Sequence, residues 1–270
     1  DVGRLDLHMH SDRSDGRHPA DAVLEQAVKG RLDVIALADH DLPNVLTPGV
    51  HELKGRSLRV LAAAEVSGSH EGKEFHLLAY FPGSMPESFR DFLRERARSR
   101  AERYDTAVRR LPFADVPLSD DDARDGRRSL TRHHLYRALR ERGHVRDARE
   151  GFALIGGATV VPLIDISYLE AIRAARAAGA FTSWAHPSFD DAERHVARFA
   201  AEGLRALEGV RPGIDRRTRN GLRGLAERHR LLLTGGSDYH GWHDPPLGTF
   251  AFTGERARSF LEALDGQAAA

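Results

Sequence analysis

The chain has 270 residues, of which 41% are hydrophobic and 30% are charged, a composition typical of a folded globular protein and not of a disordered one. Forty basic residues balance forty acidic residues, so the net charge gives no reason to expect a general attraction to nucleic acid or membranes. The sequence contains no cysteine, which excludes disulfides, thiolate nucleophiles and iron–sulfur clusters. Any metal ion must therefore be bound by histidine, aspartate or glutamate.

The sequence shows no pattern of a membrane or secreted protein. No apolar run approaches the roughly 18 residues that a membrane-spanning helix needs. The first residues also lack the charged, apolar and small-residue pattern of a secretory signal. We expect a cytoplasmic protein, or one without its targeting segment, that has no membrane partner and no obligate protein partner.

Short apolar runs alternate with helical patterns, which predicts parallel strands joined by crossover helices. Pro19 suits the first position of a helix, and Ser167 with Glu170 has the pattern of a capping box. The strands are predicted over 4–7, 34–38, 59–64, 76–80, 181–185, 206–208 and 231–234, and helices between them over 19–29, 167–178 and 216–229. The tail over 267–270 is expected to fray.

The stretch between the prolines at 82 and 162 interrupts this alternation. It contains no convincing strand and predicts three helices, over 86–111, 130–141 and 145–154, with an acidic loop over 115–126. We interpret 82–161 as a small helical insertion domain. The layered β/α domain would then comprise residues 1–81 and 162–270.

Histidines and carboxylates follow five of the predicted strands, at the end where a parallel β/α barrel builds its active site. His8 and His10 alternate along the first strand, so their side chains point to the same side of the sheet. The candidate metal ligands are His8, His10, Asp15, His40, Glu65, His76, His186, Asp238 and His240. Because one catalytic zinc uses about three protein ligands, this set favours a multinuclear site, of the kind that activates water against phosphate esters.

Other polar residues allow more than one interpretation. His76 begins its strand, so it could also be a structural histidine in a hairpin over 65–80. Asp39 is expected to orient the site from behind the ligands, and His243 to line the mouth of the pocket. The remaining histidines lack partners at ligand spacing, which favours surface or capping roles: His18, His51, His70, His144, His195 and His229.

Six motifs together resemble the PHP family, named for polymerase and histidinol phosphatase. They are DLHMH (6–10) with SDG (14–16), ADHD (38–41), AEV (64–66), HLLAY (76–80), WAHP (184–187) and GSDYH (236–240), in the order found in the family. The resemblance implies an α/β fold: a distorted (β/α)7 barrel of the PHP type with the small helical inserted domain. It also implies a trinuclear metal centre.

The resemblance also implies how the metal ligands are shared. His8, His10, Glu65 and Asp238 would bind one ion. Glu65 would bridge to a second ion bound by His76 and His186, and Asp15, His40 and His240 would bind a third. We expect two or three divalent ions of manganese, zinc or iron, because imidazole and carboxylate ligands suit all three.

The segment LTRHHLYRAL (130–139) followed by Gly143 resembles the family's phosphoesterases that act on nucleoside 3′,5′-bisphosphates and on the 5′ ends of short RNA. By this resemblance Arg132 and His134 would contact a substrate phosphate and assist catalysis. The alternative is that both residues lie on the surface of an amphipathic helix. His133 and Tyr136 stand where relatives often carry smaller residues.

The predicted function is metal-dependent hydrolysis of a phosphate monoester on a small nucleotide or short RNA, with a metal-activated hydroxide as nucleophile. The acid that protonates the leaving group stays open between Asp41, His134 and a metal-bound water. One alternative is a histidinol-phosphate phosphatase, and another is an amidohydrolase, although no lysine follows a suitable strand. A third is a non-catalytic module that binds nucleic acid or a polymerase.

Overall fold

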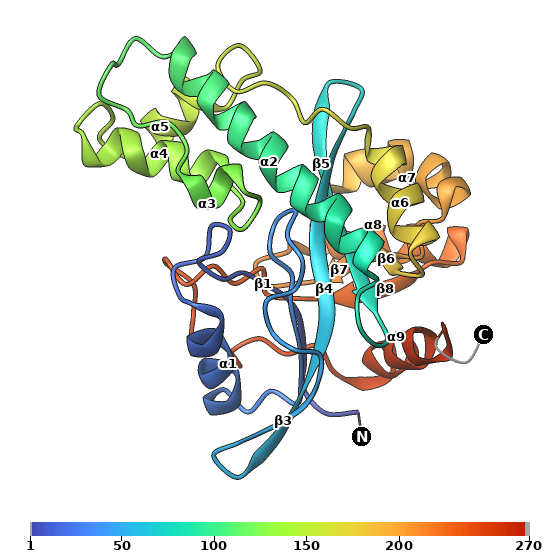
Figure 1. The fold of residues 1–270 in the computed structure, drawn as a ribbon. Helices are drawn as coiled ribbons and strands as arrows, with labels where there is room; N and C mark the ends of the chain where they lie inside the picture. The colour runs from blue at the N-terminus through green and yellow to red at the C-terminus, as the bar shows by residue number, and fades with distance from the viewer. Residues whose placement is uncertain (1, 268–270) are drawn as a thin grey trace.

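The computed structural model describes residues 2–267 and contains an eight-stranded sheet with helices packed around it (Figure 1). Most of the tail expected to fray falls on residues 268–270, outside the described residues. The strands are β1 (Leu5–Met9), β2 (Val34–Leu37), β3 (Gly49–Leu53), β4 (Arg56–His70), β5 (Lys73–Phe81), β6 (Phe181–Trp184), β7 (Ala206–Val210) and β8 (Leu232–Gly235). The helices are α1 (Ala20–Lys29), α2 (Glu87–Arg110), α3 (Asp121–Arg124), α4 (Arg132–Glu141), α5 (Ala148–Ile155), α6 (Tyr168–Ala177), α7 (Phe189–Glu202), α8 (Arg216–His229) and α9 (Gly254–Gly266).

The sheet is curled into a half-barrel in which one strand is reversed. The order is β1-β2-β4-β5-β6-β7-β8, with β3 attached to β4. All strands along this path run parallel except β5, which is antiparallel to both of its neighbours. After β8 the chain returns to β1 through the bridges Met9–Tyr239 and Leu5–Phe252. The protein is therefore an α/β protein, but β3 and the reversed β5 depart from a strict succession of β/α units.

The predicted elements agree with most of the observed ones. Each of the seven predicted runs lies largely within a strand, and the capping box of Ser167 and Glu170 begins α6. The strand β3, the helices α7 and α9 and the full length of β4 were not predicted. β3 pairs only with β4 and is largely exposed, so its sequence lacks the apolar run that marks a buried strand.

The region 82–161 contains the three predicted helices, as α2, α4 and α5. The prediction of a loop over 115–126 is wrong at residues 121–124, which form α3. The Asp120 carboxylate accepts a hydrogen bond from the Ala123 backbone N–H at 3.0 Å. An N-terminal cap of this kind satisfies a backbone donor that a short helix otherwise leaves free.

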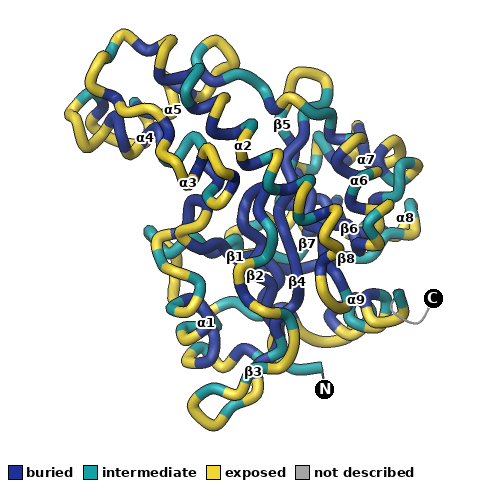
Figure 2. Tube along the Cα trace, in the orientation of Figure 1, coloured by how far each residue is buried: buried dark blue, intermediate teal, exposed yellow. Residues whose placement is uncertain are grey.

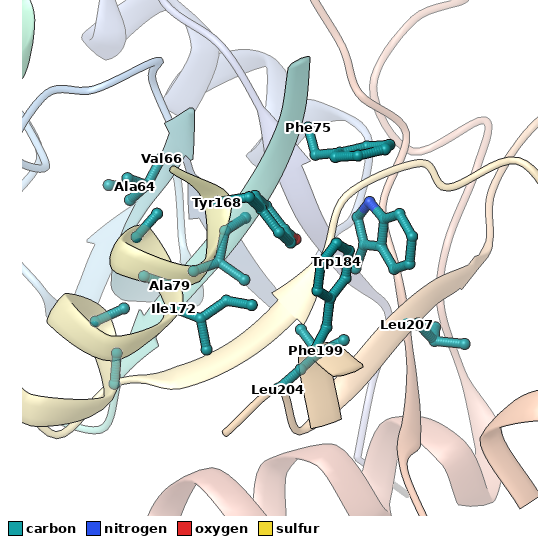
Figure 3. Close-up of a cluster of buried hydrophobic side chains, with 14 of the residues drawn as sticks. Ala64, Val66, Phe75, Ala79, Tyr168, Ile172, Trp184, Phe199, Leu204 and Leu207 are labelled. Carbon is teal, nitrogen blue, oxygen red and sulfur yellow. The ribbon is translucent and has the colours of Figure 1, made fainter. Parts of the chain in front are cut away.

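The hydrophobic core is divided between the sheet and the helical region. One buried cluster packs α6, α7 and α8 against β4 to β7, around Tyr168, Trp184 and Phe199 (Figure 3). A separate cluster joins the second half of α2 to α4 and α5, where each helix buries one face and exposes the other (Figure 2). Helix α2 belongs to both clusters, because Phe89 and Leu93 in its first half pack on the sheet side. Among residues 2–267, no helix has the length and apolar character needed to cross a membrane.

A buried ion pair attaches α2 to the sheet. The Nε atom of Arg100 lies 2.5 Å from Oδ2 of Asp41, which follows β2. Its other nitrogens donate to the Ser67 hydroxyl at 2.6 Å and to the Leu130 carbonyl at 3.1 Å. A buried guanidinium needs this number of acceptors to offset the loss of water. Arg100 thereby connects β2, β4 and the chain before α4.

Replacing Ser167 with alanine is expected to lower the free energy of unfolding by about 1 kcal/mol, because it removes the side-chain cap of α6. The Ser167 hydroxyl accepts from the Glu170 N–H at 3.1 Å. The change is measured by urea denaturation, with exposed Ser84→Ala as the matched control. Equal stability of the two variants would contradict the capping role.

Candidate metal centre

The nine candidate ligands lie at one edge of the sheet, where the parallel strands end. His8 lies on β1 and His10 follows it, while His186 and Asp238 follow β6 and β8. His76 lies in the first half of a strand, but that strand is the reversed β5 (Lys73–Phe81), and His76 pairs with Ser67 near the end of β4. The start of an antiparallel strand lies beside the ends of its neighbours. The direction of β5 therefore explains why His76 joins residues that follow strands.

The carboxylate of Glu65 is at the centre of the cluster. Its side chain is fully buried on β4, and five imidazole rings surround its two oxygens. The ring nitrogens at 3.1 to 3.2 Å are Nε2 of His8, Nε2 of His10 and Nδ1 of His40 around Oε2, and Nδ1 of His76 and Nε2 of His186 around Oε1. The rings come from segments far apart in the sequence.

Two aspartates extend the cluster to its outer side. Asp238 Oδ1 lies 3.1 Å from His10 Nε2 and 3.3 Å from His8 Nε2. Asp15 Oδ1 lies 3.1 Å from His240 Nε2, and its Oδ2 lies 3.5 Å from His40 Nε2. The structure thus brings all nine predicted residues into one connected group, although their role as ligands stays a prediction.

The donor atoms of this group suit divalent cations. Three sets of them have their atoms within 4.8 Å of one another: His10, Asp15, His40 and His240; His8, His10, Glu65 and Asp238; and His40, Glu65 and His76. Ligands about 2.1 Å from a tetrahedral ion lie about 3.4 Å apart, close to the observed distances. Among the described residues, several of these buried atoms have close neighbours but no partner in hydrogen-bond geometry, namely Asp15 Oδ1, His40 Nδ1, Glu65 Oε2 and His76 Nδ1. Unpaired buried polar atoms are unfavourable, and a bound cation would satisfy them.

The charges of the cluster also favour cations. Burial by itself raises the pKa of Glu65, but the neighbouring imidazoles hold it well below its usual range. Burial lowers the pKa of His10, yet its bonds to Asp238 and Glu65 outweigh this and raise it to about 10. The carboxylates are therefore ionised. The protons that the imidazoles hold are those that a metal ion would displace on binding.

Two of the candidate ligands have an unusual backbone conformation. His186 has φ of 35° and Asp238 has φ of 55°, in the left-handed region that non-glycine residues rarely adopt. Each is placed just beyond the end of a strand. Strain of this kind persists where the surrounding structure determines the conformation, and it is common at functional sites.

Two carboxylates that support the cluster were missed in the sequence. Glu208 on β7 has Oε1 at 2.8 Å from His8 Nδ1, and its Oε2 accepts from the His186 backbone N–H at 2.7 Å. Glu74 on β5 has Oε1 at 3.2 Å from His76 Nε2. Glu208 ends the predicted apolar strand over 206–208, and this position could have marked it as a site residue. Glu74 is two residues from His76 on the same strand, but it precedes the predicted strand over 76–80.

Asp39 lies behind the cluster, as expected. Its Oδ1 accepts from the Ser11 N–H at 2.8 Å and from the Ser14 hydroxyl at 2.5 Å, which holds the loop that leads to Asp15. Asp41, considered above as the leaving-group acid, accepts from the Ser67 N–H at 2.9 Å and pairs with Arg100. Its two oxygens are thus engaged in holding the structure together.

The three predicted substrate contacts lie around the cluster and not within it. Arg132 Nη1 is 2.9 Å from Glu74 Oε2, so it is linked to His76 through Glu74. His134 completes a capping box at the start of α4, where its Nδ1 accepts from the Thr131 N–H at 3.0 Å. Burial lowers the pKa of His134 to about 4, so this ring is neutral. His243 is exposed in the loop after β8.

The fold and the cluster define a hydrolase class that uses divalent metal ions, and known proteins with similar sequences support this. The chain is 30% identical to a phosphoribosyl 1,2-cyclic phosphate 1,2-diphosphodiesterase of Eggerthella lenta, over 87% of this chain and 94% of that protein. It is 28% identical to the 5′-3′ exoribonuclease Rnm of Escherichia coli, over 87% and 84%. It is 26% identical to a 3′,5′-nucleoside bisphosphate phosphatase of Chromobacterium violaceum, over 88% of each protein.

A solved structure from Bifidobacterium adolescentis, assigned as a metal-dependent phosphoesterase, superimposes with a TM-score of 0.76 at 27% identity, covering 97% of this chain and 96% of that one. No family model matches the sequence. The chain belongs to the PHP family of metal-dependent phosphoesterases. It is therefore an enzyme that hydrolyses phosphate esters.

Replacing Glu208 with glutamine is expected to weaken metal binding about 10- to 100-fold, the usual effect of removing a carboxylate that orients a metal-binding histidine. Glutamine preserves the size of the side chain but removes the charge beside His8. Calorimetric titration of the metal-free protein with manganese measures the affinity, with exposed Glu255→Gln as the control. An unchanged affinity in Glu208→Gln would remove Glu208 from the site.

Proposed function

We propose that this enzyme hydrolyses a phosphate monoester of a nucleotide, either a nucleoside 3′,5′-bisphosphate or the 5′ end of a short RNA. The cluster of imidazoles and carboxylates around Glu65 carries the proposal. The names of the exoribonuclease and bisphosphate phosphatase relatives point to the same substrate class.

We assign three groups of ligands within the cluster, for two or three ions of manganese, zinc or iron. His8, His10, Glu65 and Asp238 form the first group. Glu65 with His76 and His186 forms the second, and Asp15, His40 and His240 form the third. When bound, such ions supply Lewis-acid activation of a water and neutralise charge on the phosphoryl oxygens.

The residues beside the cluster would bind and orient the substrate. Glu74 holds the Arg132 guanidinium at 2.9 Å, and among the described residues the Nε–H of Arg132 has no hydrogen-bond partner. We propose that this guanidinium makes a charge-assisted bond to a phosphate oxygen. His134, whose Nδ1 caps α4, would act by fixing the first turn that carries Arg132.

A pocket lined by arginine and aromatic side chains lies next to the metal centre and would accept a nucleobase. This arginine–aromatic pocket has a volume of about 510 Å³, and its lining includes His133, Tyr136, Arg137, Phe152, Trp242 and His243. The Arg137 guanidinium lies 4.3 Å from the centre of the Trp242 ring. The Trp242 indole N–H donates to the Asp15 carbonyl at 2.8 Å, which connects the pocket to the cluster.

The same pocket supports a division of the chain into a barrel domain and an insertion over 82–161 that contributes to the substrate site. His133, Tyr136 and Phe152 come from α4 and α5, whereas Trp242 and His243 come from the loop after β8. Stacking on an aromatic ring recognises any nucleobase. A substrate without an aromatic ring, such as ribose 3,5-bisphosphate, would leave this surface unused.

Removing the metal ions with a chelator is expected to abolish phosphate release, and manganese is expected to restore it. The test is a panel of nucleoside 3′,5′-bisphosphates, 5′-phosphorylated oligonucleotides, histidinol phosphate and phosphoribosyl 1,2-cyclic phosphate. The nucleotide substrates should have the highest kcat/KM.

The His10 ring contacts both Glu65 and Asp238. Its replacement in His10→Ala is expected to abolish activity while the protein keeps a cooperative unfolding transition. Preferential hydrolysis of histidinol phosphate or of the cyclic phosphate would reject the proposed substrate. Full activity of His10→Ala would reject the proposed centre.

Replacing Phe152 with alanine is expected to raise KM for the nucleotide substrate about tenfold, because stacking on a base contributes roughly 1–3 kcal/mol. Phe152 is 41% exposed and its ring lies 5.5 Å from that of Tyr136. The matched control is Leu154→Ala on the same helix, which is 36% exposed. Activity on ribose 3,5-bisphosphate, which lacks a base, should not change; an equal loss on both substrates would argue against base recognition.

A further inference from the structure

A second group of histidine and carboxylate side chains lies away from the metal centre, at the tip of the β4–β5 hairpin. His70 ends β4, Glu71 lies in the turn, and His195 comes from α7. Glu71 Oε1 is 3.8 Å from His70 Nε2, and its Oε2 is 4.0 Å from His195 Nε2. His70 and His195 are far apart in the sequence, and they come together because α7 packs against the hairpin.

The two imidazoles rest on an aromatic surface. The His195 ring stacks on Phe199 at 5.6 Å, and the His70 ring meets the same phenyl edge-on at 5.2 Å. Phe75, which lies beside Phe199 and Trp184 in the core (Figure 3), is 5.8 Å from His195. The side chains of His70 and His195 are only 18% and 8% exposed. Apolar surroundings favour neutral imidazole, the form that binds metal ions.

Side chains of both charges surround His70, Glu71 and His195, and one of them is a second carboxylate. Asp191 lies one turn before His195 on α7 and acts on it electrostatically, as does Arg194 with the opposite sign. Asp191 itself pairs with Lys73. Glu71 is therefore the carboxylate free to bind a cation, since its side chain is 62% exposed and its contacts with the two histidines are long.

We propose that His70, Glu71 and His195 bind one zinc ion, or a similar divalent cation, that joins the hairpin tip to α7. Two imidazole nitrogens and one carboxylate oxygen form a typical zinc ligand set, with water in the fourth position of the tetrahedron. The observed separations exceed the roughly 3.4 Å expected around bound zinc. A small rotation of the exposed Glu71 side chain would close the site.

This site, which we call the hairpin zinc site, is separate from the metal centre and does not depend on the proposed function. His70 pairs with Lys73 across the hairpin, whereas His76 pairs with Ser67. Three residues along a strand correspond to about 10 Å. The ion would connect the tip of the β4–β5 hairpin, whose strands carry Glu65 and His76, with α7, which follows His186. It would therefore stabilise segments next to the metal centre.

The experiment counts zinc in the full-length protein after loading and removal of free ions. The unmodified protein is expected to hold one zinc per chain more than His70→Gln, Glu71→Gln and His195→Ala. The matched control is His229→Gln, a histidine at the end of α8, which should keep the full zinc content. Because His195 is buried and its replacement could disturb folding, the exposed Glu71 provides an independent variant.

A second measurement follows thermal unfolding. Zinc at about a hundredfold above its dissociation constant is expected to raise Tm by roughly 5 °C through this site, and Glu71→Gln should lose that part of the shift while His229→Gln retains it. Equal zinc content and equal shifts in all variants would overturn the proposal, leaving His70 and His195 as packing residues of the core.

Discussion

The structure of the site depends on one buried carboxylate. Glu65 is enclosed on β4 and has ring nitrogens of five histidines within 3.2 Å. An isolated ionised carboxylate is very unfavourable in such a place, so the charge persists only because the surrounding rings compensate it. The same arrangement gathers imidazole and carboxylate atoms close enough together to bind a cation. Glu208 contacts the ring of His8, and Asp39 holds the loop that leads to Asp15. These two carboxylates thereby fix the orientation of the side chains around Glu65.

The sequence allowed the fold class and the candidate ligands to be predicted because both depend on local patterns. Apolar runs marked the strands, and histidines or carboxylates after five of the seven runs marked the candidate site. The direction of β5 was not predictable in this way, since an alternating strand reads the same in either sense. A hairpin over 65–80 was considered only as an alternative in which His76 is structural. The structure contains this hairpin between β4 and β5, and it brings His76 to the cluster.

Contacts between distant segments explain the other gaps. Glu74 contacts His76, Arg103 and Arg132 together. It is two residues from His76 on one strand, but no spacing in the sequence relates it to the two arginines. No pattern in the sequence relates His70 to His195 either. The exposed β3 and the helix α9 lacked strong boundary signals in the sequence. Helix α7 had them, with Ser188 and Asp191 at its start and Gly203 at its end, and was overlooked. Local propensity is a weak guide where the partner surface decides.

Helix α2 spans 24 residues, or about 36 Å of continuous helix, and its two halves pack into different hydrophobic clusters. Near its middle, Arg100 is bonded to Asp41, the neighbour of His40. Because both halves of α2 are packed and Arg100 near its middle is bonded to Asp41, we expect α2 to behave as one rigid element. In this structure the helical region is therefore attached to the sheet along the length of α2, and through Asp41 to the segment that carries His40.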